Sequence, residues 1–217
     1  YDDYPKYLYD DNLLNDAAYL FNKDIMLEEV YPAFVRTLKR LPRSTFDEYA
    51  NWHHQAQYGK EMVLQDYDNS SESDVQIIFS EQDRVMVKEN VEQNIITLAI
   101  ENPDITFCYF LTPYSIAQWD VWYHEGNVMR NLEAERLAIE MMLEHDNIRV
   151  FSFLNAFDIV SNLDLYKDML HYHEDINSLI MKHMAAGEYL ITAQNCITYF
   201  EQVEEYYTSH ETYAKIH

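Results

Sequence analysis

The residues best suited to chemistry are Asp168 and His171, in the segment Tyr166-Lys-Asp-Met-Leu-His-Tyr172. The spacing Asp-x-x-His lets one turn of the chain hold a carboxylate beside an imidazole. The carboxylate can then fix the tautomer of the ring and stabilise the imidazolium while the other ring nitrogen takes up a proton. Asp168 and His171 are therefore the candidate catalytic pair, as orienting acid and general base.

Other interpretations of these residues stay open. Asp168 and His171 would also suit a capping or hydrogen-bonded surface pair without chemistry. Asp164 is a second candidate acid, but its separation of seven residues from His171 favours a capping or loop role. A metal site is a further alternative, because zinc and manganese bind imidazole and carboxylate groups such as those of Asp168, His171, His173 and Glu174. Alternate residues of a helix point apart, however, which disfavours such a site. We predict no metal and no cofactor.

Composition and motifs exclude several other classes of function. With 38 acidic and 15 basic residues, the net charge of -23 repels phosphate backbones and anionic membrane surfaces, so we expect no nucleic-acid partner. No glycine-rich phosphate loop, zinc-spaced cysteine pair or dinucleotide fingerprint occurs, and Cys108 and Cys196 indicate no disulfide. No stretch approaches the roughly 20 apolar residues that span a bilayer, so we expect no membrane-spanning segment.

Two strands and two helices are predicted around the candidate pair. The β-branched and aromatic run over 105–111 is typical of a strand buried on both faces of a parallel sheet, and a second apolar run covers 148–153. Apolar residues at helical spacing predict helices over 80–101, opened by a capping box, and over 127–144. This alternation implies right-handed crossovers and a parallel sheet. Asp168 and His171 then follow the second strand, where α/β folds place their sites.

The rest of the chain is predicted to be mostly helical. Apolar periodicity favours helices over 16–40, interrupted at Pro32, and over 45–57, 175–186 and 192–208. Trp119 and Trp122 follow the first strand and are more typical of a core than of a sugar-binding platform, although they would also suit a cleft wall. We expect one domain over 1–217, with a helical and loop region over 1–75 and an α/β core over 76–217.

The order of these motifs resembles SGNH or GDSL hydrolases of Gram-positive bacterial cell envelopes. In that superfamily an Asp-x-x-His motif follows the final strand and supplies two members of a Ser-His-Asp triad. The segments that carry the resemblance are Phe107-Cys-Tyr-Phe-Leu-Thr-Pro-Tyr-Ser115, Asn147-Ile-Arg-Val-Phe-Ser-Phe153, Tyr166 to Tyr172 with Ile176-Asn-Ser178, and the opening Tyr7-Leu-Tyr-Asp-Asp11 with Tyr19-Leu-Phe-Asn-Lys23.

The resemblance implies a three-layer, flavodoxin-like α/β fold, helix-rich with a small parallel sheet. It implies that Asp168 orients His171, and that His171 serves as general base for an acyl-serine intermediate. The implied substrates are ester-linked groups of a cell-envelope polysaccharide or an acylated small molecule. The implied location is outside the membrane, behind an amino-terminal anchor that lies outside this chain.

One departure from the superfamily is decisive for activity. Its nucleophilic serine lies in an early Gly-Asp-Ser type block, but here Gly59, Gly126 and Gly187 precede lysine, asparagine and glutamate. We therefore expect the carboxyl-terminal portion of such a domain, inactive alone and incomplete in its sheet. An exposed sheet edge would promote self-association. The alternative is a non-catalytic interaction or structural module on the same scaffold.

Overall fold

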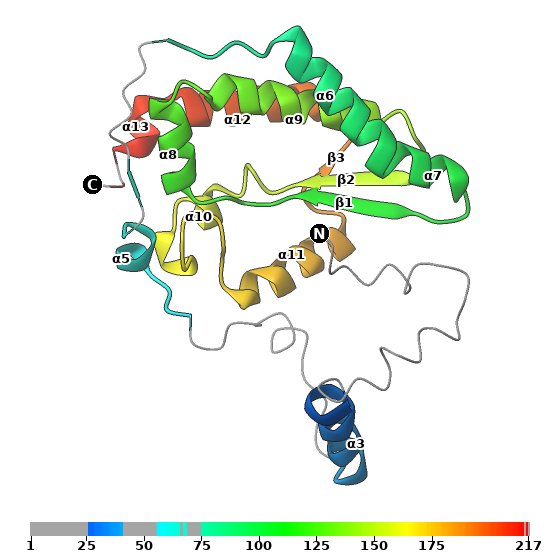
Figure 1. Cartoon of the computed structure of the whole chain (residues 1–217). Coiled ribbons are helices and arrows are strands. Elements are labelled where there is room, and N and C mark those ends of the chain that lie inside the picture. Colours follow the sequence, from blue (N-terminus) through cyan, green and yellow to red (C-terminus); the bar gives the residue numbers. More distant parts are fainter. Residues whose placement is uncertain (1–25, 41–55, 66, 69–74, 215, 217) are drawn as a thin grey trace. The chain divides into compact units, whose positions relative to one another are not determined.

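The computed structural model describes residues 26–40, 56–65, 67–68, 75–214 and 216. The chain divides into two compact units, 1–45 and 46–217. In the first unit a π-helical turn, η2 (Met26–Val30), continues into α3 (Tyr31–Leu38), drawn in blue in Figure 1. Pro32 lies in the first turn of α3, where its missing N–H removes no helical hydrogen bond. The predicted helix over 16–40 is confirmed for 26–38, and its first part lies outside the described residues.

The second unit contains a three-stranded mixed sheet in the order β1-β2-β3, with β1 (Phe107–Leu111), β2 (Ile148–Ser152) and β3 (Leu190–Ile191). β1 pairs parallel to β2, with Tyr109 opposite Val150, while β3 pairs antiparallel to β2. Both predicted strands and their parallel pairing are confirmed. The prediction of a wholly parallel sheet is wrong, because β3 runs antiparallel to β2. β3 was not predicted, since a strand of two residues is too short to show an apolar pattern. The helix-rich α/β class holds.

β1 is an edge strand of this sheet. Its residues alternate, with Cys108 and Phe110 exposed and their neighbours half-buried. The prediction that this strand is buried on both faces is therefore wrong. A continuous apolar run looks the same in sequence whether one or both of its faces is covered.

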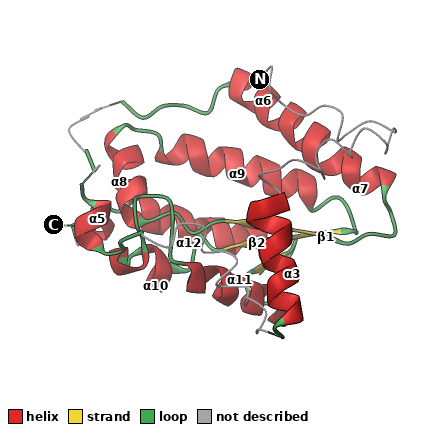
Figure 2. Cartoon of the chain, turned by 60° about the horizontal axis from the view of Figure 1, so that its bottom comes forward, coloured by secondary structure: helices red, strands yellow, loops and turns green. Residues whose placement is uncertain are grey.

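Three long helices form a layer on one face of the sheet (Figures 1 and 2). α6 (Glu81–Val91) continues through the π-helical segment η3 (Glu92–Ile96) into α7 (Thr97–Glu101). α9 (Val128–Met142) packs between α6 and α12 (Cys196–Thr208), and it also packs on β2. The order α6-α9-α12 therefore follows the order β1-β2-β3, with α6 on the outer, β1 side. The predicted helices over 80–101 and 127–144 are confirmed.

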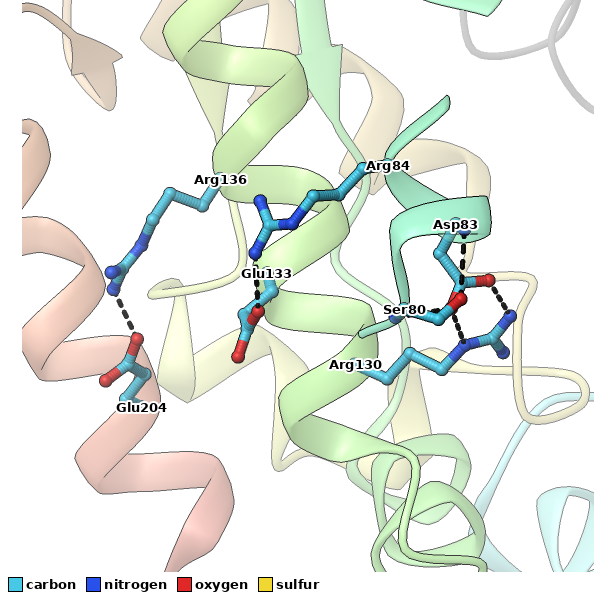
Figure 3. A network of polar contacts seen from close by, with 7 residues as sticks. All are labelled: Ser80, Asp83, Arg84, Arg130, Glu133, Arg136 and Glu204. Carbon is cyan, nitrogen blue, oxygen red and sulfur yellow. Dashed lines mark hydrogen bonds and ion pairs between the residues drawn. The ribbon is translucent and has the colours of Figure 1, made fainter. Parts of the chain in front are cut away.

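Ion pairs join the helices of this layer across α9 (Figure 3). Ser80 caps α6, and Asp83 completes the predicted capping box. The same Asp83 carboxylate accepts hydrogen bonds from Arg130 of α9, at 2.5 Å from Nη2 and 3.2 Å from Nε. The Arg130 guanidinium and the capping bonds hold the pKa of Asp83 well below its usual range. On the other side of α9, Arg136 pairs with Glu204 of α12.

Shorter elements complete the unit, and α11 (Glu174–Ala186) covers the opposite face of the sheet from the α9 layer (Figure 1). The predicted helices over 175–186 and 192–208 are confirmed, the second beginning at Cys196. The predicted helix over 45–57 lies mostly outside the described residues. The remaining elements are α5 (Lys60–Val63), α8 (Ile116–His124), α10 (Phe157–Val160), the 3-10 turn η4 (Leu163–Leu165) and α13 (His210–Tyr213).

The sequence did not indicate α8, because α8 is buried around much of its circumference. Consecutive residues such as Trp119 and Asp120 are both buried, so no apolar stripe of helical period marks the helix. Trp119 is fully buried, stacks on Tyr207 with ring centroids 3.9 Å apart and meets Trp122 edge-on. The interpretation of Trp119 as a core residue is confirmed, and its ring forms no sugar-binding platform.

Asn147 connects the end of α7 to the start of β2. Its Nδ2 lies 2.9 Å from the carbonyl oxygen of Ala99, 3.3 Å from that of Asn102 and 3.2 Å from that of Ile105. Its own carbonyl accepts a hydrogen bond from Phe107 N–H at 2.8 Å. One half-buried amide therefore fixes the loop that leads from the helix layer into β1.

We expect Asn147→Ala to lower the free energy of unfolding by about 1–3 kcal/mol, because carbonyls at the α7 end lose their donor. Urea denaturation followed by circular dichroism measures the change. The matched control is Asn94→Ala, since the exposed Asn94 amide donates to the carbonyl of Asn90, one turn earlier in the same run of helix. An equal loss in the two variants would contradict this role for Asn147.

Glu135 of α9 has a buried carboxyl, whose charge acts on Tyr199 and Tyr207 of α12. The residue as a whole is half-buried, but its Oε2 atom is fully buried and has no hydrogen-bond partner among the described residues. Burial raises the pKa of Glu135 to about 8. Because the proton is held more tightly in the folded state than in the unfolded one, stability is greatest below the unfolded pKa of about 4.5 and falls as pH rises towards 8.

Glu135→Gln keeps the shape of the side chain and removes this titration. The free energy of unfolding of the variant, minus that of the unmodified protein, should therefore increase on going from about pH 5 to about pH 9. The increase should be on the order of 1–3 kcal/mol after allowance for partial exposure. Urea denaturation at the two pH values measures the difference. Glu140→Gln, at an exposed position of the same helix, is the control. A stability difference between the Glu135→Gln variant and the parent that is independent of pH would refute the buried titration.

Candidate active site

The candidate catalytic pair is in contact. Nδ1 of His171 lies 2.7 Å from Oδ2 and 2.9 Å from Oδ1 of Asp168. Oδ1 also accepts the backbone N–H groups of Leu170 at 2.9 Å and of His171 at 2.8 Å. An aspartate side chain that bonds the backbone two and three residues ahead closes a tight turn. The carboxylate therefore shapes the turn and holds the imidazole with the same atoms.

The ends of this turn are tied together by a short antiparallel bridge. Tyr166 pairs with Tyr172, and the N–H of Lys167 donates to the carbonyl of His171 at 3.0 Å. Tyr166 is fully buried, and its hydroxyl donates to the carbonyl of Pro113 at 2.6 Å. Because Pro113 follows β1, this bond fixes the turn beside the carboxyl end of the parallel strands.

Ser115 is a second anchor that the sequence did not indicate. Its hydroxyl donates to the carbonyl of Met169 at 2.7 Å, and its oxygen accepts the N–H of Gln118 at 3.4 Å as the cap of α8. Its side chain is fully buried and committed to these bonds. Ser115 therefore positions the turn and is not available as a nucleophile. Its partner lies 54 positions away in the chain, so no local pattern reveals the contact.

The pair is open to solvent, and Asp168 stays ionised in this setting. Burial alone would raise the pKa of Asp168, but the N–H groups of Leu170 and His171 and the imidazole together hold it below its usual range. The His171 side chain is 57% exposed, and its Nε2 has no hydrogen-bond partner within the described part of the chain. A carboxylate at Nδ1 favours the neutral tautomer with its proton on Nδ1. Nε2 then offers a lone pair to solvent, as a general base requires.

The other sequence candidates have hydrogen-bond partners of their own. Asp164 belongs to η4, where its Oδ1 accepts the backbone N–H of Lys60 at 3.1 Å, which confirms a loop role. His173 caps α11 by accepting the N–H of Asp175 at 3.3 Å. Glu174 accepts the Tyr58 hydroxyl at 3.3 Å, and burial followed by the charge of Glu174 raises the pKa of Tyr58.

The described residues offer the pair no metal site. No group of three histidine, cysteine or acidic side chains there is arranged to hold a metal ion. A cavity of about 190 Å³ beside η4 is lined by Lys60, Ser161 and Asp164 among others, but not by Asp168 or His171. Cys108 and Cys196 are free thiols.

Comparison of the chain with protein-family models, with curated proteins and with solved structures finds no match. The SGNH interpretation therefore rests on the residues and remains a proposal. Among the helices of the described residues, none has the length and apolar character to cross a bilayer.

The tautomer of His171 can be tested by ¹⁵N NMR of the imidazole at about pH 8.5, where histidine side chains are neutral. We expect the proton on Nδ1 in the unmodified chain. In Asp168→Asn the amide oxygen should take the place of Oδ1, which accepts the two backbone N–H groups, so that the NH₂ group faces Nδ1 and moves the ring proton to Nε2.

His183 provides an internal control, because it lies on α11, contacts Glu188 just after that helix and should keep its tautomer in the variant. The same His171 tautomer in both proteins would show that Asp168 does not orient the ring.

Proposed function

We propose that this chain supplies the acid and base of an SGNH-like serine esterase or acyltransferase acting on ester-linked groups of a cell-envelope polysaccharide or a similar polymer. The observation that carries the proposal is the 2.7 Å contact between Asp168 Oδ2 and His171 Nδ1, in a turn anchored beside the carboxyl ends of β1 and β2. The substrate class comes from the sequence resemblance.

In the proposed reaction, His171 Nε2 takes the proton of a serine hydroxyl as that oxygen attacks the ester carbonyl. The imidazolium is stabilised by Asp168 and then protonates the leaving alcohol, which leaves an acyl-serine. Water or a second hydroxyl, deprotonated by the same nitrogen, attacks the acyl group and restores the serine. The printed side-chain partner of His171 is Asp168 and not a serine of the described residues, and the sequence holds no Gly-Asp-Ser type block, so the proposal takes the nucleophile from outside this chain.

A non-catalytic interaction module is the second candidate, and two observations favour it. The Asp168–His171 pair faces solvent, and neither residue lines the cavity of about 190 Å³ beside η4. A wide apolar groove lies instead between the helix layer and the edge of the sheet. Such a groove suits a macromolecular partner better than the open turn suits a small substrate.

We expect the isolated chain to hydrolyse p-nitrophenyl acetate no faster than buffer and to take no label from a fluorophosphonate probe, because a triad without its serine has little activity. The full-length product of the gene should be labelled by the probe. There His171→Ala and Asp168→Asn should each lower turnover by about 10³–10⁴-fold.

The control variant in the full-length product is His183→Ala, on α11, which should leave turnover unchanged. Serine-dependent turnover by the isolated chain would contradict the proposal that the nucleophilic serine comes from outside this chain. A full-length product without turnover or label would favour the interaction module.

A further inference from the structure

An open groove of about 780 Å³ lies between α6 and β1, over α9. Its walls are mostly apolar. They include Met86 and Val87 of α6, Ile95 of η3, Tyr109 and Leu111 of β1, and Ala138 of α9. Met86 is 57% exposed and Phe110 of the same groove is 40% exposed, so apolar surface here remains open to water.

The groove runs beside unpaired backbone groups of β1. Phe107 N–H donates to Asn147, and the Leu111 carbonyl accepts from Phe153 N–H, so these alternate residues of β1 direct their backbone groups towards β2. In a parallel pair the residues between them point the other way. The N–H and C=O groups of Cys108 and Phe110 therefore face the free edge, where no strand of the described residues pairs.

The helix layer extends beyond this edge. α6 packs on the β1 side of α9 (Figures 1 and 2), and neighbouring helices lie about 8–10 Å apart whereas strands lie about 4.8 Å apart. α6 therefore covers the position that one further strand would occupy beside β1. If a second copy paired through its own β1, its α6 would collide with α9 of the first copy. The extension of α6 past β1 therefore disfavours edge-to-edge dimers.

The acidic lining of the groove favours an extended segment that carries a positive charge. Its acidic residues are Glu89 and Glu135, and among the described residues no lysine, arginine or histidine lines it. The Oε2 atom of Glu135 is buried there without a partner among the described residues. A cationic donor placed beside this carboxyl would supply the missing hydrogen-bond partner and favour the ionised form that burial disfavours.

We propose that this groove binds an extended segment of a separate partner protein, which adds a strand to the free edge of β1. Alternate apolar side chains of that segment insert beneath α6, and one lysine or arginine reaches Glu135. This is strand addition, in which backbone bonds supply affinity and side-chain pockets supply selectivity. The inference uses neither Asp168 nor His171, so it stands whether or not the proposed hydrolase chemistry is correct.

The test uses a fluorescein-labelled peptide of about seven residues, capped at both ends, that alternates valine with threonine and has a central lysine on the valine face. We expect saturable binding to the chain by fluorescence anisotropy, with slowed amide hydrogen exchange at Cys108 and Phe110. N-methylation of the alternate backbone nitrogens that would face β1 should abolish binding. Glutamate in place of the central lysine should weaken binding by about tenfold or more.

Glu135→Gln should remove most of the preference for lysine over glutamate, whereas the control Glu140→Gln should retain it. Equal binding of the N-methylated peptide, absence of saturable binding, or exchange that is slowed only outside β1 would each overturn the proposal. So would a dimer in sedimentation whose β1 amides are already protected without peptide, because a second copy would then be the occupant.

Discussion

The parallel pairing of β1 with β2 is the constraint on which the rest of the second unit depends. It brings the carboxyl ends of two strands to one edge, where the Tyr166 hydroxyl reaches the carbonyl of Pro113 and holds the turn of Asp168 and His171. The same pairing uses one side of β1 and leaves its other side without a strand in the described residues. The candidate active site and the peptide groove are therefore two consequences of one register, at different borders of the sheet.

The helix layer responds to the strongly acidic character of the chain. With 15 basic residues against 38 acidic ones, like-charge repulsion between helices has to be offset locally. Arg130 and Arg136 do this on the two sides of α9, towards Asp83 of α6 and Glu204 of α12 (Figure 3). Such exposed pairs are each weak, and here they place opposite charges at both contacts of the central helix. Glu135 lies between them in sequence and has no such partner among the described residues, which marks the groove as a different environment.

The sequence was sufficient for features set by local pattern. The capping box at Ser80 and the long apolar periods predicted α6, α7 and α9, and the Asp-x-x-His spacing predicted the contact of Asp168 with His171. Features that depend on contacts between distant parts of the chain could not be predicted from the sequence. β3 has two residues, α8 is buried without a stripe, and Ser115 and Tyr166 act through partners more than fifty positions away. The orientation of β3 and the exposure of β1 depend on which strands are neighbours, and periodicity carries no such information.

The hydrogen bonds at Asp168 have a consequence for how this motif is inherited. One carboxylate closes the turn through two backbone N–H groups and also holds the imidazole, so most substitutions at this position would disturb both. Selection for a folded chain alone would preserve an aspartate or an asparagine here, whereas only the aspartate keeps the tautomer that a general base needs. An Asp-x-x-His signature can therefore persist for the sake of the turn, and by itself it establishes neither an active enzyme nor a family.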